Sequence, residues 1–390
     1  MKKYLIICLA ACMLLAASAA MAADKTIRVG VLAALSGPTS DVGPSYANGI
    51  RDCANWLNET KYVPGHTFEI ILQDYAYNAQ QAITIYRRFT SKDKIVALQG
   101  WGTADTEALT QFVARDRVPT LSASYSAHLT DPSKTPYNFF ISTDYTTQLR
   151  GGLQYLRDAW TESRAPRLAL IYPDHPYGKA PIAGGKAFAR EIGFEVVGEE
   201  TVALGALDAT AQLLAVRDMK PDFVWIGGTT SSTAVILKDA KKLDFSPTFL
   251  TNIWGVDENI FKLAGDAAEG VYTLQASAVY GADVPGMKII EQATKGEPQM
   301  THYIRGFASM LVMAEGARVA AAKGSVTGPT LKDALETLRD YDPMGLVPPV
   351  SFFPDDHRPS MSVMIYRIEN GEFVLKGTPT LPRKAEWLGN

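Results

Sequence analysis

The sequence predicts an α/β protein of two lobes, each built around a doubly wound parallel sheet. Short apolar runs rich in β-branched residues alternate with amphipathic helical segments along most of the chain, and strands that alternate with helices form parallel sheets. The 390 residues are too many for one ordinary core but suit two lobes of roughly 100–200 residues each. With 47% apolar and 20% charged residues, the composition excludes a disordered or fibrous chain.

The first set of elements begins with an apolar run at 27–32, which ends at a turn that contains Gly37 and Pro38. A helical spacing of apolar residues follows it. The same order of strand and helix then repeats, and one more strand closes the set. The expected strands are 27–32, 68–72, 95–98 and 120–122, and the expected helices are 45–57, 79–89 and 106–113.

A second set of the same kind starts after the apolar run at 139–142. Its periodicity again switches between strand and helix, which predicts a second parallel sheet. The expected strands are 168–172, 223–226 and 249–250, and the expected helices are 147–159, one that follows Gly178, and 233–242.

The chain changes character past Gly270. A long alanine-rich helix at 303–322 and a shorter one at 331–338 precede two late strands, near 364–366 and 373–374. These pieces are too few for a third lobe, so they complete the first two, and the chain must cross between the lobes several times to form a hinge. The expected lobes are 23–143 with about 276–352, and 144–275 with about 353–390.

The segment 1–22 has the order of a secretory signal peptide. Lys2 and Lys3 precede an apolar stretch that runs to Ala17, and small residues follow as far as Ala22. We expect cleavage after Ala22 and a periplasmic mature chain. A membrane anchor is one alternative, although polar residues directly follow the apolar run. A lipoprotein with its lipid on Cys12 is another, although its leader would be unusually short.

The net charge limits the classes of binding partner, and the cysteine content limits disulfide formation. The formal net charge of −3 argues against nucleic acid or an anionic membrane surface. Cys8 and Cys12 leave with the leader, so the mature chain keeps only Cys53 and cannot form an internal disulfide. Cys53 lies on the apolar face of the expected 45–57 helix, where we expect a buried, unreactive thiol. We expect a monomer that binds a small solute.

The sequence carries no motif for catalysis, a metal or a cofactor. Its five histidines include no pair four residues apart, and no Cys-x-x-Cys or His-Glu-x-x-His occurs. A Gly-x-Ser-x-Gly elbow and a phosphate-binding loop are also absent, and the glycines at 100 and 102 lack the third glycine of a dinucleotide-binding loop. We therefore expect no metal, no cofactor and no enzyme activity, and a binding function instead.

Ligands of open parallel sheets bind beyond the carboxyl ends of the strands. The loops expected there, 35–39, 100–105 and 122–126, are rich in polar and aromatic residues. Small hydroxyl residues at helix starts can offer side-chain oxygens and backbone N–H groups to a carboxylate. They are also ordinary helix N-caps, so one alone means little. Three such loops that converge on one crevice predict a ligand site.

Several stretches match a known family in order and spacing. They are 27–38 with Gly43 and Asn48-Gly49, then 118–122, 129–132, Asp144 with Gln148, and 172–178. Together they resemble the extracytoplasmic solute-binding proteins of ABC importers, of the leucine/isoleucine/valine-binding type. The likeness covers nearly all of the mature chain.

This resemblance implies the type I periplasmic binding protein fold, with two Rossmann-like lobes joined by a hinge of three crossings. It implies a periplasmic protein that captures a small amino-acid-like or carboxylate solute between the lobes and delivers it to an ABC transporter permease. Closure of the lobes on the solute is the hinge mechanism of such proteins. A ligand-sensing receptor of the same fold is an alternative, and a secreted enzyme is a weaker one.

The expected ligand-binding residues come from the resemblance and from position in the loops. The resemblance assigns the first-lobe group to the carboxylate and amino group of an amino acid, and the second-lobe group to the opposite wall of the cleft. The first-lobe group is Thr103, Ala104, Ser124 and Ser126, and the second-lobe group is Tyr177 and Thr229. Loop position adds Trp101, Asp105 and Asp144, and Trp254 is added as an aromatic candidate.

One departure from the family concerns a ligand ammonium group. The stretch 250–255 lies where the α-amino-acid binders usually carry a glutamate, and no acidic residue occurs there before Asp257. Removing one partner of a buried charge pair costs about 3–5 kcal/mol. Asp105 or Asp144 could supply the missing charge. Aromatic residues of these loops would instead suit an aromatic or other neutral-tailed carboxylate, and they are Trp101, Tyr125, Tyr145 and Trp254.

Overall fold

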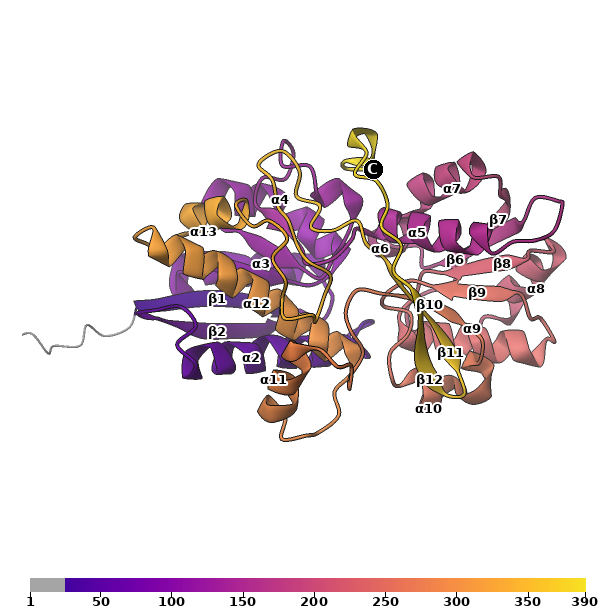
Figure 1. Cartoon of the computed structure of the whole chain (residues 1–390), viewed down its shortest axis with the longest axis horizontal. Coiled ribbons are helices and arrows are strands. Elements are labelled where there is room, and N and C mark those ends of the chain that lie inside the picture. The colour runs from indigo at the N-terminus through magenta and orange to yellow at the C-terminus, as the bar shows by residue number, and fades with distance from the viewer. Residues whose placement is uncertain (1–24) are drawn as a thin grey trace, which may run out of the picture.

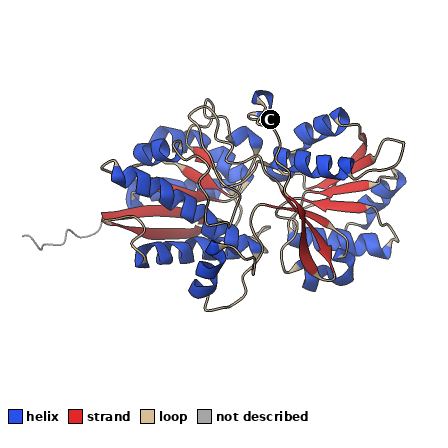
Figure 2. Ribbon diagram, viewed as in Figure 1, coloured by secondary structure: helices blue, strands red, loops and turns tan. Residues whose placement is uncertain are grey.

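The computed structural model describes residues 25–390, so the leader expected at 1–22 lies outside the described residues. The chain forms two lobes that lie side by side, one made mainly from its first third and the other mainly from its middle (Figure 1). Each lobe has strands in its interior and helices around them (Figure 2). The predicted fold class, an α/β protein of two sheet-based lobes, is confirmed.

The first lobe contains a wholly parallel sheet in the order β2-β1-β3-β4-β5. Two of its three inner strands, β3 and β4, are buried along their whole length, as expected for parallel strands with helices on both faces. The strands are β1 (Lys25–Ala33), β2 (His66–Asp74), β3 (Ala97–Gly100), β4 (Thr120–Ser122) and β5 (Asn138–Phe139).

Helices cover both faces of this sheet. The β1-to-β2 and β2-to-β3 connections run in opposite directions along the sheet, so right-handed crossovers put α2 and α3 on opposite faces. α12 packs on α2, and α4 packs on α3. The helices of this lobe are α2 (Gly43–Glu59), α3 (Ala79–Arg88), α4 (Thr103–Asp116), α11 (Pro285–Ala293), α12 (Thr301–Ala322) and α13 (Gly328–Leu335), with short helical turns at Phe89–Asp93 and Ala127–Leu129.

The second sheet has the order β12-β11-β10-β9-β8-β6-β7 and is parallel from β6 to β10. The prediction of a parallel sheet fails at one edge, where β11 and β12 run antiparallel. Asn370 and Gly371 join them directly with φ of 55° and 74°, the two-residue turn that favours a hairpin. The strands are β6 (Arg167–Tyr172), β7 (Glu195–Thr201), β8 (Phe223–Ile226), β9 (Thr248–Thr251), β10 (Tyr272–Gln275), β11 (Met364–Glu369) and β12 (Glu372–Gly377).

The helices of the second lobe begin with α5, which leads from the hinge into the lobe. The helices α6, α8 and α10 of this lobe were not predicted from the sequence, and neither were α11, β7 and β10. No residue of β7 is fully buried, so this strand lacks the continuous apolar run that reveals the inner strands. The helices are α5 (Tyr145–Asp158), α6 (Pro176–Lys179), α7 (Ile182–Glu191), α8 (Thr210–Asp218), α9 (Thr230–Lys242) and α10 (Ile260–Ala264), with short helical turns at Gly265–Ala268 and Ala385–Trp387.

Within residues 25–390 the chain passes between the lobes three times, from β5 to α5, from β10 to α11 and from α13 to β11. The third crossing is anchored to the first lobe by His357, whose ring stacks on Phe139 at 4.1 Å and whose Nε2 lies 2.9 Å from Glu336. Thr143, in the first crossing, donates a hydrogen bond to the carbonyl of Ser362 in the third. The crossings therefore form one connected hinge.

Helix α12 is held against α2 by direct contact between the two backbones. A Cβ atom at Gly49 would lie 2.1 Å from the carbonyl oxygen of Tyr303, and one at Gly306 would lie 2.0 Å from that of Tyr46. Only glycine fits at such distances. α12 also contacts the sheet, where Ser309 Oγ donates to Gln99 at 2.7 Å. These contacts determine where the first turn of α12 lies at the edge of the lobe.

We predict that Gly306→Ala lowers the free energy of unfolding by roughly 1–3 kcal/mol, because α12 and α2 must move apart to admit the methyl group. Gly377→Ala is the matched control, since a Cβ there would meet the Tyr155 ring at an ordinary 3.7 Å. Denaturant unfolding of both variants and the wild type measures the difference. Equal stability of Gly306→Ala and the wild type would contradict the close packing.

Candidate functional site

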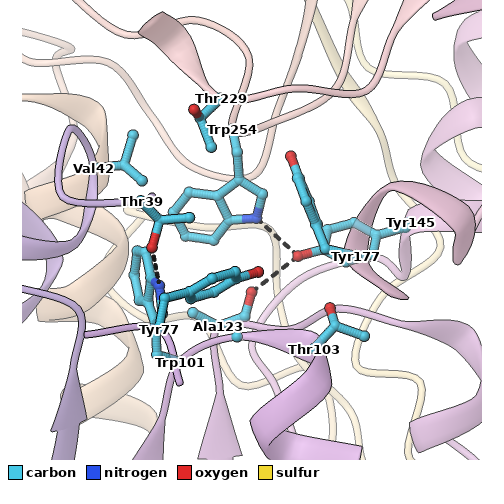
Figure 3. A pocket seen from close by; sticks show the side chains of 11 residues that line it. Thr39, Val42, Tyr77, Trp101, Thr103, Ala123, Tyr145, Tyr177, Thr229 and Trp254 are labelled. Carbon is cyan, nitrogen blue, oxygen red and sulfur yellow. Dashed lines mark hydrogen bonds between the residues drawn. The ribbon is translucent and has the colours of Figure 1, made fainter. Parts of the chain in front are cut away.

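A cavity of about 20 Å³ lies between the lobes, with room for about one water molecule (Figure 3). Its walls come from loops that follow strands of both sheets, which is where ligands of parallel sheets bind. The first lobe contributes Thr39, Val42, Tyr77, Trp101, Gly102, Thr103 and Ala123, and the second contributes Tyr145, Tyr177, Thr229 and Trp254. Five of the expected ligand-binding residues therefore line the cavity, namely Trp101, Thr103, Tyr177, Thr229 and Trp254.

Thr103 begins helix α4 at the first-lobe wall of the cavity. Its hydroxyl lies 2.8 Å from Ser124 Oγ, which lies 3.1 Å from Ser126 Oγ. The two serines are buried behind Thr103 and, like Ala104, are not among the residues that line the cavity. The first N–H groups of a helix have no partner within the helix and carry its positive dipole end. This corner of the cavity is suited to an anionic group.

Asp105 lies beneath the start of α4 rather than in the cavity wall. One carboxylate oxygen accepts a hydrogen bond from the Tyr75 hydroxyl at 2.8 Å, and the other accepts from the Gly102 N–H at 3.2 Å. Burial raises the pKa of Asp105 to about 7, and these hydrogen bonds offset only part of that effect. Its carboxyl group holds the Trp101-to-Thr103 turn in place from behind.

Asp144 has a similar structural position at the start of α5. Its Oδ1 accepts a hydrogen bond from the Thr147 N–H at 2.8 Å and caps the helix, while Oδ2 is buried without a hydrogen-bond partner. Burial raises the pKa of this carboxyl group. The two carboxylates that could have paired with a ligand ammonium thus both lie behind the cavity wall.

Trp254 reaches from the loop after β9 to the first lobe. Its ring meets that of Trp101 edge-on, with centroids 5.2 Å apart, and its Nε1 donates to the Tyr145 hydroxyl at 2.9 Å. The Tyr145 hydroxyl in turn donates to the Ala123 carbonyl at 3.1 Å, as the dashed lines in Figure 3 show. The N–H of Trp101 is bonded to Thr39 at 3.0 Å. Because both indole N–H groups have partners, the rings are fixed in orientation.

The opposite wall is held by contacts within the second lobe. The Tyr177 hydroxyl donates to the Gly228 carbonyl at 2.9 Å and accepts from the Asn252 side chain. The Thr229 hydroxyl is buried without a hydrogen-bond partner at the start of α9. Thr229 is therefore the free polar group of this wall, whereas Tyr177 presents mainly its ring.

Six residues that line the cavity were not among the expected ligand-binding residues, and one of them, Tyr145, was named only as an aromatic candidate. The other five are Thr39, Val42, Tyr77, Gly102 and Ala123. Tyr77 follows β2, so the rule that selected loops after the other strands would have found it. It has a left-handed φ of 58°, and its ring stacks on His175 of the second lobe at 5.2 Å. The residue before it, Ala76, donates a hydrogen bond from its N–H to the Asp74 side chain.

The pattern that defines the periplasmic binding protein family matches residues 26–372. The leucine-, isoleucine-, valine-, threonine- and alanine-binding protein of Pseudomonas aeruginosa is 21% identical over 304 residues, which are 77% of this chain and 80% of that protein. None of the helices among residues 25–390 is long and apolar enough to cross a membrane.

Two solved structures share the fold closely. The ABC transporter substrate-binding protein of Aeropyrum pernix is 31% identical with a TM-score of 0.86, covering 94% of this chain and 98% of its own. A branched-chain amino acid ABC transporter structure from Thermus thermophilus with bound valine is 25% identical with a TM-score of 0.87, covering 93% and 98%. The chain belongs to the periplasmic binding protein family, and the resemblance seen in the sequence is confirmed.

We predict that Asp105 makes stability depend on pH. Its folded-state pKa of about 7 exceeds the roughly 3.9 of an unfolded aspartate, so the contribution of its proton to stability is complete below about pH 4 and is lost as the pH rises to about 7. Asp105→Asn cannot titrate. The melting temperature of the wild type should therefore fall relative to that of the variant between about pH 4 and 7, as thermal unfolding would measure. A difference that is constant across this range would contradict the raised pKa.

Proposed function

We propose that the chain is a periplasmic solute receptor that captures a small carboxylate between its lobes and delivers it to the permease of an ABC importer. The observation that carries the proposal is a cavity enclosed by the carboxyl-end loops of both sheets. The Tyr145 hydroxyl also joins Trp254 of the second lobe to Ala123 of the first. A solute that contacts both walls favours the closed arrangement over the open one.

The start of α4 supports a carboxylate as the head group of the solute. Thr103 offers its hydroxyl, backed by the hydroxyls of Ser124 and Ser126, and the first N–H groups of α4 have no partner within the helix. Hydrogen bonds to a charged acceptor contribute about 1.5–3 kcal/mol each. The solute's carboxylate would sit against this turn.

The rest of the cavity supports a neutral and flat body for the solute. Its walls carry the rings of Tyr77, Trp101, Tyr145, Tyr177 and Trp254, and none of the residues that line it is charged. Such walls suit an aromatic or other apolar group with few polar atoms. At about 20 Å³ the closed cavity is smaller than any such solute, so entry requires the lobes to separate or the rings to shift.

An α-amino acid is the second candidate, because relatives of this chain are described as binding leucine, isoleucine and valine. Its ammonium group would find no carboxylate in the cavity wall. Asp257, the first acidic residue after β9, is already paired with His302 at 3.1 Å. Leaving a buried charge without its partner costs about 3–5 kcal/mol. The cavity therefore favours a solute that lacks an ammonium group.

The family and the leader support a periplasmic location and a transport role over catalysis. The curated relatives are solute-binding proteins, and the order of residues 1–22 is that of a secretory signal. We propose a monomer that meets its permease in the closed form. A sensory role on the same fold would use the same cleft and closure, with a receptor or kinase in place of the permease.

We predict that small carboxylates raise the melting temperature more than amino acids do. A solute that binds only the folded state stabilises it by mass action. Benzoate should raise the melting temperature, benzamide should do so much less because it lacks the charge, and leucine should fall below benzoate. A thermal-shift screen with these three compounds measures the order. Stronger stabilisation by leucine would favour the amino-acid candidate instead.

The hydroxyls at α4 should matter more for binding than the Tyr177 hydroxyl. Thr103→Ala with Ser124→Ala removes polar groups next to the proposed carboxylate, so affinity should fall by roughly 100-fold. Tyr177→Phe removes a hydroxyl that is bonded within the second lobe and should change affinity far less. Calorimetry with the best compound of the screen compares them. The assignment of the carboxylate to α4 fails if only Tyr177→Phe weakens binding.

A further inference from the structure

Beside the cavity, a second set of contacts joins the lobes through buried charged side chains. The first turn of α12 lies in the first lobe, and the segment 253–258 follows β9 in the second. Asp257, His302 and Arg305 are fully buried where these two pieces meet. Apart from Trp254, the residues of both pieces were absent from the expected ligand site and do not line the cavity.

Glu258 of the second lobe caps helix α12 of the first. Its carboxylate oxygens accept hydrogen bonds from the Thr301 N–H at 2.8 Å and the Thr301 hydroxyl at 2.7 Å. Met300, at the N-cap position of α12, provides no side-chain bond of its own. A carboxylate at this end of a helix is stabilised by the helix dipole. This cap exists only while the lobes are together.

Asp257 and His302 form a fully buried pair across the same interface, with Oδ2 and Nε2 3.1 Å apart. The imidazole is not well aligned for a hydrogen bond, so the contact is chiefly electrostatic. On the other side of the ring, His302 Nδ1 lies 3.2 Å from Arg305 Nη1. Because a guanidinium can only donate, Nδ1 accepts, and the ring hydrogen is on Nε2, the nitrogen nearer to Asp257.

Arg305 holds the loop that carries Trp254. Its guanidinium donates to the Ile253 carbonyl and to the Gln275 side chain, both in the second lobe, and lies 5.0 Å from the centre of the Trp254 ring. Nε has no partner, and no carboxylate forms an ion pair with this guanidinium among the described residues. Burial lowers the pKa of Arg305 to about 10. Its buried charge is therefore satisfied mainly by second-lobe groups.

We propose that Asp257, Glu258, Thr301, His302 and Arg305 form a clasp that closes the lobes without touching the solute, with Arg305 as the positioning residue for Trp254. Apart from the contact between His302 and Arg305 within α12, each contact of the clasp spans the two lobes. When the lobes separate, every one of these polar groups can return to water. When one partner is removed, the others stay buried and unpaired in the closed form only, so the equilibrium shifts toward the open form.

The clasp rests on the proposed function only for its effect on affinity, because lobe closure can be measured without any solute. In small-angle scattering of the protein alone, the wild type should fit the closed structure, and Arg305→Met should have a larger radius of gyration. Breaking a buried charged contact should change the ratio of closed to open forms by roughly 100-fold. Trp254 should become exposed to solvent in the variant, which shifts its fluorescence emission to longer wavelength. The Trp254→Phe substitution is also made in the wild type and in Arg305→Met. Subtracting the emission spectra of these two proteins from those of their parents isolates the signal of Trp254.

Two further variants separate positioning from general damage. Arg305→Lys keeps the charge and should restore much of the closed form. Arg150→Met is the matched control, because Arg150 is also buried and lies 4.4 Å from a tryptophan ring, that of Trp387, but contacts neither α12 nor the segment 253–258. It should leave the radius and the Trp254 emission unchanged. The affinity of Arg305→Met for a solute from the screen should fall by about tenfold or more, chiefly through faster dissociation.

The clasp is refuted if unliganded wild type is as extended as Arg305→Met, if both match the closed structure, or if Arg150→Met opens the lobes equally. If circular dichroism shows that Arg305→Met does not fold, Glu258→Gln and Asp257→Asn replace it, because they break the same contacts from the segment 253–258. Their radius of gyration and Trp254 emission are then judged in the same way. A screen in which no compound binds would count against the proposed solute alone, because the scattering experiment contains none.

Discussion

The carboxyl ends of two parallel sheets face one another, and this constraint decides where the functional residues lie. In a parallel sheet every strand ends at the same edge, so the loops that follow β1, β2, β3 and β4 gather on one side of the cavity. The loops after β6, β8 and β9 gather opposite them. Residues as distant in the chain as Thr39 and Thr229 thereby line one cavity, and the three-strand hinge keeps the two edges opposed.

The cavity wall is neutral because the carboxylates near it lie behind the wall and bind backbone N–H groups at helix ends. Asp105 and Asp144 lie at the starts of α4 and α5, where each carboxylate supports a helix end from behind the wall and burial raises its pKa. The rings in front satisfy their own polar atoms, as Trp254 does with Tyr145. Few polar groups remain for a ligand, chiefly at Thr103 and Thr229. Such a wall obtains specificity from a small number of placed donors in aromatic surroundings.

In the proposed mechanism, ligand contact and lobe closure are coupled through one loop. The segment after β9 supplies Trp254 to the cavity and, a few residues later, Asp257 and Glu258 to the first turn of α12. The close packing of α12 on α2 leaves that turn little freedom, so the loop docks against a rigid surface. A solute that shifts Trp254 must therefore also act on the contacts of Arg305, and anything that frees this loop changes the population of the closed form.

The sequence by itself determined the alternation of strands and helices, because inner parallel strands need unbroken apolar runs. Strand β8 spans Phe223–Ile226 as predicted, whereas the half-exposed β7 gave no such signal. The sequence also located the loops that hold Trp101 and Thr103, since binding loops follow strands. Only the tertiary structure decided that Thr103 faces the cavity while Asp105 lies behind it, and that Arg305 meets Trp254. Those outcomes depend on how helix ends and lobes pack across long sequence distances, which local periodicity does not encode.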